Sequence, residues 1–193
     1  MTTARLRPEG PADVPGVRRV LGEAFARPGV AVPDEVTLVD ALRDTDAWLP
    51  ELAMVAEFDG GDDDSIPEDA ETFGQVVGYA LLTRVRVDPA GFPALALGPV
   101  AVRPARQRRG YGTAVVWAAL DAAAELGERL VVVLGDPAWY ERFGFAPASK
   151  LGLTSPWSGL GAPWQALVLP PDVSGAEPVP PGEVRYPPPW SQV

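Results

Sequence analysis

Two glycines, Gly110 and Gly112, stand where an apolar stretch gives way to an alanine-rich one. Residues 94–103 are predicted to form a strand and residues 113–126 a helix that ends at Gly127. The first turn of a helix presents backbone N–H groups without intrahelical partners and carries a partial positive charge, so it can bind phosphate. Glycine leaves the backbone uncovered at such a turn. The segment therefore predicts an α/β unit whose helix begins at a site for a diphosphate-bearing ligand.

Other glycine-containing phosphate motifs do not fit this segment. No Gly-Lys-Ser/Thr follows, as a P-loop requires, and Val115 stands where the dinucleotide motif Gly-x-Gly-x-x-Gly needs its third glycine. Arg108 and Arg109 can add charge-assisted hydrogen bonds to an anion. The alternative interpretation is a glycine-hinged turn with arginines that face solvent.

The remaining elements alternate between strands and helices. Further strands are predicted over residues 5–7, 53–58, 75–86, 130–134 and 166–169. The run 130–134 is continuously apolar, which is typical of a strand buried on both faces. Gly98-Pro99 interrupts the strand over 94–103 and predicts a bulge, because proline cannot donate to a β-ladder.

Three acidic residues are predicted to cap helices. Asp13 precedes an apolar stripe from Val14 to Phe25, and Asp34 precedes a second stripe. These two helices are expected to cover the sheet. Asp136-Pro137 opens a short helix that ends at Gly144. The pattern as a whole predicts an α/β fold with one mixed sheet.

Composition excludes several kinds of chemistry. The sequence contains no cysteine and no histidine, which excludes thiolate nucleophiles, thiolate or imidazole metal ligands and a Ser-His-Asp triad. Net charge is −10, which argues against a nucleic-acid partner. We expect no metal, no membrane span and a cytoplasmic location, since no apolar stretch approaches the roughly 20 residues of a span.

Charge is distributed unevenly along the chain. Arg103, Arg106, Arg108 and Arg109 crowd into seven residues of an acidic protein, which favours a small anionic ligand. The stretch 59–71 carries seven acids and no base and is predicted to be a mobile hairpin loop. Its alternative role is an acidic lip that attracts a cationic substrate.

The last part of the chain, residues 171–193, is rich in proline. We expect a C-terminal extension to a domain over residues 1–170. The extension is either a docking segment for a partner or a segment whose Tyr186 and Trp190 fold back onto the sheet.

The segment Val102-Arg103-Pro104-Ala105-Arg106-Gln107-Arg108-Arg109-Gly110-Tyr111-Gly112 resembles the acetyl-coenzyme A signature of the GNAT N-acetyltransferase superfamily. A second feature of that superfamily, Tyr140-Glu141-Arg142-Phe143-Gly144-Phe145, follows at the expected distance. The resemblance extends from Arg5 through the strand at Ala166. Within the superfamily, the sequence looks like a branch of bacterial predicted N-acetyltransferases. It implies a single GNAT-like domain with a bulged, splayed strand and helices on both faces of the sheet.

The resemblance also implies roles for individual residues. The amide of Val100 would stabilise the oxyanion, and that of Val102 would hold pantetheine. Tyr140 would protonate the departing thiolate, although it could instead simply pack beside Trp139 and Phe143. The pyrophosphate would be bound by Gln107, Arg108, Arg109, Gly110, Tyr111, Gly112 and Thr113.

The general base is not identified by the sequence. Many family members place a glutamate on the bulged strand, but Leu95-Ala96-Leu97-Gly98 has no acid. Glu35, Asp46, Glu51, the acidic stretch 59–71 or a water chain could substitute.

The expected function is direct transfer of an acetyl group from acetyl-coenzyme A to an amine. The acceptor would be a small molecule or a protein, with a cationic amine favoured by the acidic charge, and a homodimer is one assembly to consider. The alternative is a non-catalytic acyl-coenzyme A sensor, which would explain the missing strand carboxylate.

Overall fold

A computed structural model of the chain describes residues 4–58, 75–170 and 177–192. The acidic stretch 59–71 lies outside the described residues. Within them, nine strands form one mixed sheet. The strands are β1 (Ala4–Pro8), β2 (Ala53–Phe58), β3 (Val76–Asp88), β4 (Phe92–Val102), β5 (Leu130–Leu134), β6 (Ala146–Pro147), β7 (Leu153–Thr154), β8 (Trp164–Val168) and β9 (Gly182–Arg185).

The strands follow the order β1-β2-β3-β4-β5-β8-β6, and β9 pairs with β3 and β7. The pairs β4–β5 and β7–β9 are parallel, and the other pairs are antiparallel. The predicted mixed sheet is confirmed.

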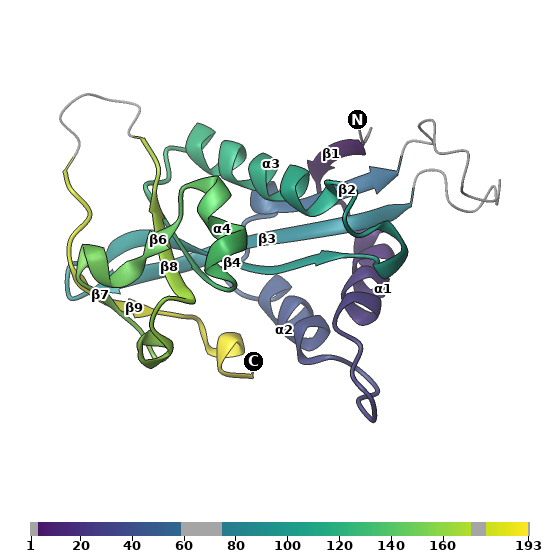
Figure 1. Ribbon diagram of the computed structural model, residues 1–193, viewed down its shortest axis with the longest axis horizontal. Coiled ribbons are helices and arrows are strands. Elements are labelled where there is room, and N and C mark those ends of the chain that lie inside the picture. Colours follow the sequence, from purple (N-terminus) through teal and green to yellow (C-terminus); the bar gives the residue numbers. More distant parts are fainter. Residues whose placement is uncertain (1–3, 59–74, 171–176, 193) are drawn as a thin grey trace.

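Helices cover both faces of the sheet, with α3 and α4 on one side and α1 and α2 on the other (Figure 1). Their bounds are α1 (Val14–Ala24), α2 (Asp34–Arg43), α3 (Tyr111–Glu125) and α4 (Pro137–Tyr140). Alternation along β2 divides the core between the faces. Met54 and Ala56 pack in the cluster beneath α3, while Ala53 and Val55 pack in the cluster of α1 and α2.

The predicted helix caps are only partly confirmed. The carboxylate of Asp136 accepts a hydrogen bond from the Ala138 N–H at 3.0 Å, as a cap should. Asp13 makes no side-chain cap bond, because its carboxylate instead binds Arg7 and the Gly10 N–H. Asp34 is the first residue of α2 rather than its cap. The predictions for Asp13 and Asp34 as caps were therefore wrong.

Strand β4 bulges where the sequence predicted. Ala80 of β3 pairs with Val100, but Leu82 pairs with Leu97, so Gly98 and Pro99 together lie opposite a single β3 residue. On its other edge, β4 pairs with β5 only over residues 95–97. Among the described residues no strand pairs with that edge beyond Leu97. The two parallel strands therefore diverge there, and the expected splay is confirmed.

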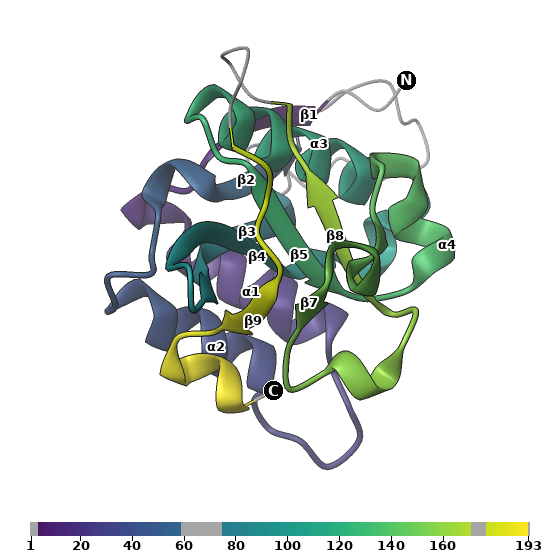
Figure 2. The same cartoon turned by 90° about the vertical axis from the view of Figure 1, so that its left-hand side faces the viewer.

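The last residues fold back onto the sheet. β9 pairs with residues 86–88 of β3, and the following 3₁₀ turn lies beside α2 (Figure 2). The indole Nε1 of Trp190 donates to Thr83 Oγ1 at 3.2 Å, and Thr83 is fully buried. Of the two possibilities for this segment, the described residues 177–192 show the one in which Tyr186 and Trp190 return to the sheet.

Candidate active site

The turn before α3 adopts a conformation that exposes its backbone. α3 begins at Tyr111, two residues earlier than predicted, and Gly110 precedes it with φ of 92°. Arg108 has φ of 60°, which is uncommon for a residue with a Cβ atom. Residues held in this region cluster at ligand sites, where the surrounding structure stabilises them. The N–H groups of Gly112 and Thr113 lie in the first turn of α3, where a helix offers them no carbonyl acceptor, so they can bind an anion.

A groove of about 580 Å³ runs from this turn along the end of β4 to α4. Its described lining consists of Val100, Ala101, Val102, Arg106, Gln107, Arg108, Gly110, Tyr111, Gly112, Thr113, Trp139, Tyr140 and Arg142. The structure thus gathers all but one of the predicted cofactor residues around one hollow. Arg109 is the exception and lies outside this lining.

The four clustered arginines do not act together. Arg103 pairs with Glu23 at 2.9 Å. Arg106 is buried, and its guanidinium carbon lies 4.1 Å from the centre of the Phe58 ring. The charge of Arg103 is therefore neutralised by Glu23 and adds little to the attraction of an anionic ligand. Arg108 remains exposed at the groove.

Backbone donors face the open edge of β4. Arg103 N–H donates to Val77 O across the β3–β4 ladder, and N–H direction alternates along an antiparallel strand. Ala101 therefore faces β3, as Arg103 does, and Val100 and Val102 direct their N–H groups to the other edge. That edge is where β5 has diverged. Strand N–H groups without a neighbouring strand can donate to other acceptors, so this edge can bind the amide carbonyls of an extended ligand such as pantetheine.

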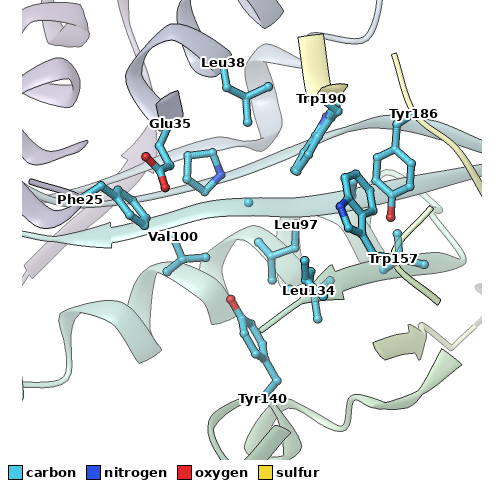
Figure 3. A pocket seen from close by; sticks show the side chains of 15 residues that line it. Phe25, Glu35, Leu38, Leu97, Val100, Leu134, Tyr140, Trp157, Tyr186 and Trp190 are labelled. Atoms are coloured by element: carbon cyan, nitrogen blue, oxygen red, sulfur yellow. The ribbon is translucent and has the colours of Figure 1, made fainter. Parts of the chain in front are cut away.

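Tyr140 is held at the end of the groove by other aromatic rings. Its centroid lies 4.7 Å from that of Trp139, 5.6 Å from Phe145 and 6.2 Å from Phe143. The side chain is buried, and this burial raises the pKa of the Tyr140 phenol to about 12. The phenol is therefore protonated at neutral pH and can donate a proton. The packing alternative and the catalytic role are compatible, because the rings hold the body of Tyr140 and leave its hydroxyl directed at β4 (Figure 3).

The absence of a side chain at Gly135 makes room for the Tyr140 ring. A Cβ atom at Gly135 would lie 2.3 Å from Cε2 of Tyr140. Gly135 follows β5 directly and is held by its N–H donating to Pro163 O at 2.9 Å. The end of β5 thus fixes the tyrosine against the splayed edge.

A second cavity of about 320 Å³ lies beside the first and shares Val100 and Tyr140 with it. It opens where β4 and β5 diverge, and Figure 3 shows its side chains. Its described lining consists of Phe25, Glu35, Leu38, Ala96, Leu97, Gly98, Pro99, Val100, Val132, Val133, Leu134, Tyr140, Trp157, Tyr186 and Trp190. Two ligands, one in each cavity, would therefore meet at Val100 and Tyr140.

The candidate general bases differ in whether they line the second cavity. Glu35 lines it from the first turn of α2. Asp46 and Glu51 are absent from the described lining of both cavities. The acidic stretch 59–71 falls outside the described residues.

Several lining residues were not predicted as site residues. Arg142 lies within the Tyr140–Phe145 motif and packs its guanidinium 5.5 Å from the centre of the Trp139 ring, so its position in the motif could have identified it. Trp157, Tyr186 and Trp190 come from the last third of the chain. Their only signal was that large aromatics occur in proline-rich sequence, which does not reveal what they contact.

Residues 4–58, 75–170 and 177–192 contain neither a membrane-spanning helix nor a metal-binding cluster. No helix in them is both long enough and apolar enough to cross a bilayer. No group of three or more His, Cys, Asp or Glu side chains in them could hold a metal ion.

Comparison with known proteins identifies the family. The model of the acetyltransferase (GNAT) family matches residues 36–145, more than half of the chain. The uncharacterized N-acetyltransferase YhbS of Escherichia coli K12 is 33% identical over 160 residues, which cover 83% of this chain and 84% of YhbS.

Two solved structures are similar along nearly the whole chain. The crystal structure of E. coli YhbS in complex with CoA has a TM-score of 0.78 at 30% identity and covers 99% of this chain and 93% of its own. The structure of a GNAT family acetyltransferase from Brucella melitensis in complex with acetyl-CoA has a TM-score of 0.70 at 30% identity, covering 98% and 99%. The chain therefore belongs to the GNAT family and is an acetyl-coenzyme A-dependent N-acetyltransferase that acts on an amine.

Proposed function

We propose that the groove beside α3 holds acetyl-coenzyme A and that the second cavity holds a cationic amine. The main-chain donors at Gly110–Thr113 bind the pyrophosphate, with added charge from Arg108. The amides of Val100 and Val102 bind at the thioester and pantetheine end. The observation that carries this proposal is that the two cavities share Val100 and Tyr140.

The amine enters the site as an ammonium and first loses a proton. Its lone pair then forms a C–N bond to the thioester carbonyl carbon, and the C–S bond breaks. The nitrogen loses a second proton as the amide forms. The Val100 N–H donates to the carbonyl oxygen as negative charge develops on it, a contribution of about 3 kcal/mol for one such donor.

Tyr140 gives its phenolic proton to the departing sulfur and regains one from solvent. The products are the amide, the coenzyme A thiol and one released proton. An aliphatic thiol has a pKa of about 8.5, and Tyr140 has a pKa of about 12. The Tyr140 phenol therefore stays protonated until the thiolate forms, and the aromatic rings around it hold the hydroxyl in place.

A non-catalytic acyl-coenzyme A sensor would need only the groove that binds the cofactor. The second cavity, which meets that groove at Tyr140 and carries a carboxylate, favours an enzyme with an acceptor. The role of the missing strand carboxylate can be taken by a side chain from another element. A cytoplasmic location, a homodimer and the domain limits at residues 170 and 171 stay predictions.

The test is thiol release from acetyl-coenzyme A over a panel of amines, for the wild type and Tyr140→Phe. We expect amine-dependent release, with kcat lowered about 10²- to 10⁴-fold in the variant, as for loss of a general acid. Coenzyme A affinity should be unchanged. Equal kcat in the two proteins would refute the role of Tyr140, and absence of release with every amine would favour the sensor.

A further inference from the structure

The second cavity has one charged side chain in an apolar surround. Among its described lining residues, only Glu35 carries a charge at neutral pH. The rest of the lining is aliphatic or aromatic, apart from the backbone of the bulge. One ammonium could bind this carboxylate, whereas a second charge would be buried without a partner.

The two oxygens of Glu35 have different surroundings. Oε1 accepts from Arg27 Nη2 at 2.9 Å, and Arg27 is 58% exposed while Glu35 is 14% exposed. Oε2 is buried and has no hydrogen-bond partner among the described residues. A buried acceptor without a donor is unfavourable, and a ligand donor that reached Oε2 would remove that cost.

Glu35 and Tyr140 approach the splayed edge from opposite sides of β4. Figure 3 shows the Glu35 carboxylate extending from α2 towards the strand that carries Val100, and the Tyr140 hydroxyl extending towards it from the other side. An ammonium near Glu35 is therefore on the side of the thioester opposite to the general acid, which is where an attacking nitrogen belongs.

The far end of the cavity is a wall of three aromatic rings from the C-terminal third of the chain. The centroids of Trp157 and Tyr186 lie 4.6 Å apart at 87°, and those of Tyr186 and Trp190 lie 5.5 Å apart at 60°. The rings pack edge against face, so they cover one another's faces instead of surrounding a cation. A Cβ atom at Gly98 would lie 3.4 Å from Trp190 Cη2, so the indole lies directly over the β4 bulge.

We propose that the acceptor is a primary amine with a single positive charge and an apolar body about the size of one aromatic ring. Glu35 Oε2 binds its ammonium, and its body lies against Leu38, Leu97 and Trp190. This inference rests on the proposed function, because it names the acceptor for the same site. The cavity volume of about 320 Å³ accommodates such a molecule at the lower limit of ligand pockets.

The test measures binding rather than turnover. Protein saturated with coenzyme A, which cannot donate an acetyl group, is titrated calorimetrically with 2-phenylethylamine, 2-phenylethanol and 1,4-diaminobutane. We expect 2-phenylethylamine to bind at least about tenfold more tightly than 1,4-diaminobutane, since its ring gains apolar burial and the second ammonium of the diamine has no carboxylate.

Variants locate the charge contact. Glu35→Gln keeps the shape of the side chain and should weaken 2-phenylethylamine about 10- to 100-fold, the range for a hydrogen bond to a charged group. It should leave the Kd of 2-phenylethanol and of coenzyme A unchanged. Glu51→Gln is the matched control, because Glu51 is exposed and outside the described lining of both cavities. Thermal unfolding of each variant checks that it is folded.

Failure of this inference can be distinguished from failure of the proposed function. Tighter binding of 1,4-diaminobutane, no binding of 2-phenylethylamine, or an unchanged Kd in Glu35→Gln would each overturn the acceptor class, whatever the enzyme transfers. Binding as expected without thiol release from acetyl-coenzyme A would leave the acceptor site standing and overturn the catalytic proposal.

Discussion

Replacement of Gly135 by alanine should displace Tyr140, the proposed general acid, without changing that residue itself. The new methyl group would lie 2.3 Å from Cε2 and 2.9 Å from Cδ2 of Tyr140. Carbon atoms in contact lie about 3.5–4.0 Å apart, so the ring must move by more than about 1 Å. Trp139 and Phe145 pack against the ring and oppose a return to its position. Misplacing a reacting group by about 1 Å can lower the rate about 100-fold.

We therefore expect Gly135→Ala to lower kcat about 100-fold, with overpacking that destabilises the fold by about 1–3 kcal/mol. Steady-state thiol release gives kcat, calorimetry gives the Kd of coenzyme A, and thermal unfolding gives the stability. The Kd should be unchanged, because Gly135 is not among the described residues that line the groove proposed to hold coenzyme A.

Gly22→Ala is the matched control, since a Cβ atom at Gly22 has nothing within 4 Å. The double variant Gly135→Ala/Tyr140→Phe separates the explanations. If the methyl group acts through Tyr140, the double variant should have the same kcat as Tyr140→Phe alone. A wild-type kcat in Gly135→Ala, or losses that multiply in the double variant, would refute the reasoning.

Three further predictions concern pH and the C-terminal segment. Because burial raises the pKa of Tyr140 to about 12, its proton is present below that pH and lost above it. The value of kcat/KM for an alkyl amine should therefore rise with pH up to the pKa of the amine, about 10, and show no fall below about pH 11. A falling limb near pH 8–9 that disappears in Tyr140→Phe would contradict this. Thr83→Val keeps the shape of a fully buried side chain but removes the acceptor of Trp190 Nε1. We expect a loss of stability of about 1–3 kcal/mol, with Tm lower by about 2–4 °C per kcal/mol in calorimetric unfolding. An unchanged Tm would show that the indole hydrogen bond contributes nothing to stability. Gly182→Ala would place a Cβ atom 2.1 Å from Asp88 O, so β9 should detach from β3. Titrations should then show weaker binding of the acceptor and unchanged binding of coenzyme A. Equal loss of acceptor and coenzyme A binding would mean that the segment supports the whole fold.

Local features of the site could be predicted from the sequence. Gly110 and Gly112 marked the turn that precedes α3, and Gly98-Pro99 marked the bulge, because glycine frees and proline restricts the backbone where they stand. The Asp136 cap was likewise local. Such features depend on neighbours within a few residues, which a sequence displays directly.

Features that depend on distant partners could not be predicted. Trp190 bonds Thr83 across 107 positions of the chain, and nothing near either residue indicates the other. Asp13 matched a helix-cap pattern, but its carboxylate instead accepts a hydrogen bond from Arg7 of β1. Glu35 entered the list of bases as one of several acids, and only the packing of α2 beside β4 places it at a cavity.

We propose that main-chain donors at the start of α3, left uncovered at Gly112, bind the diphosphate of coenzyme A. A Cβ atom at Gly112 would lie 3.4 Å from Val102 Cγ2 and 3.6 Å from Trp139 Cζ2, so Gly112→Leu would fill the groove with side-chain atoms. Calorimetric titration with coenzyme A should show one site in the wild type and in Gly22→Leu, and binding weaker by about tenfold or more in Gly112→Leu, a loss of only ~1.4 kcal/mol. No heat of binding to the wild type, or the same Kd in Gly112→Leu, would contradict it.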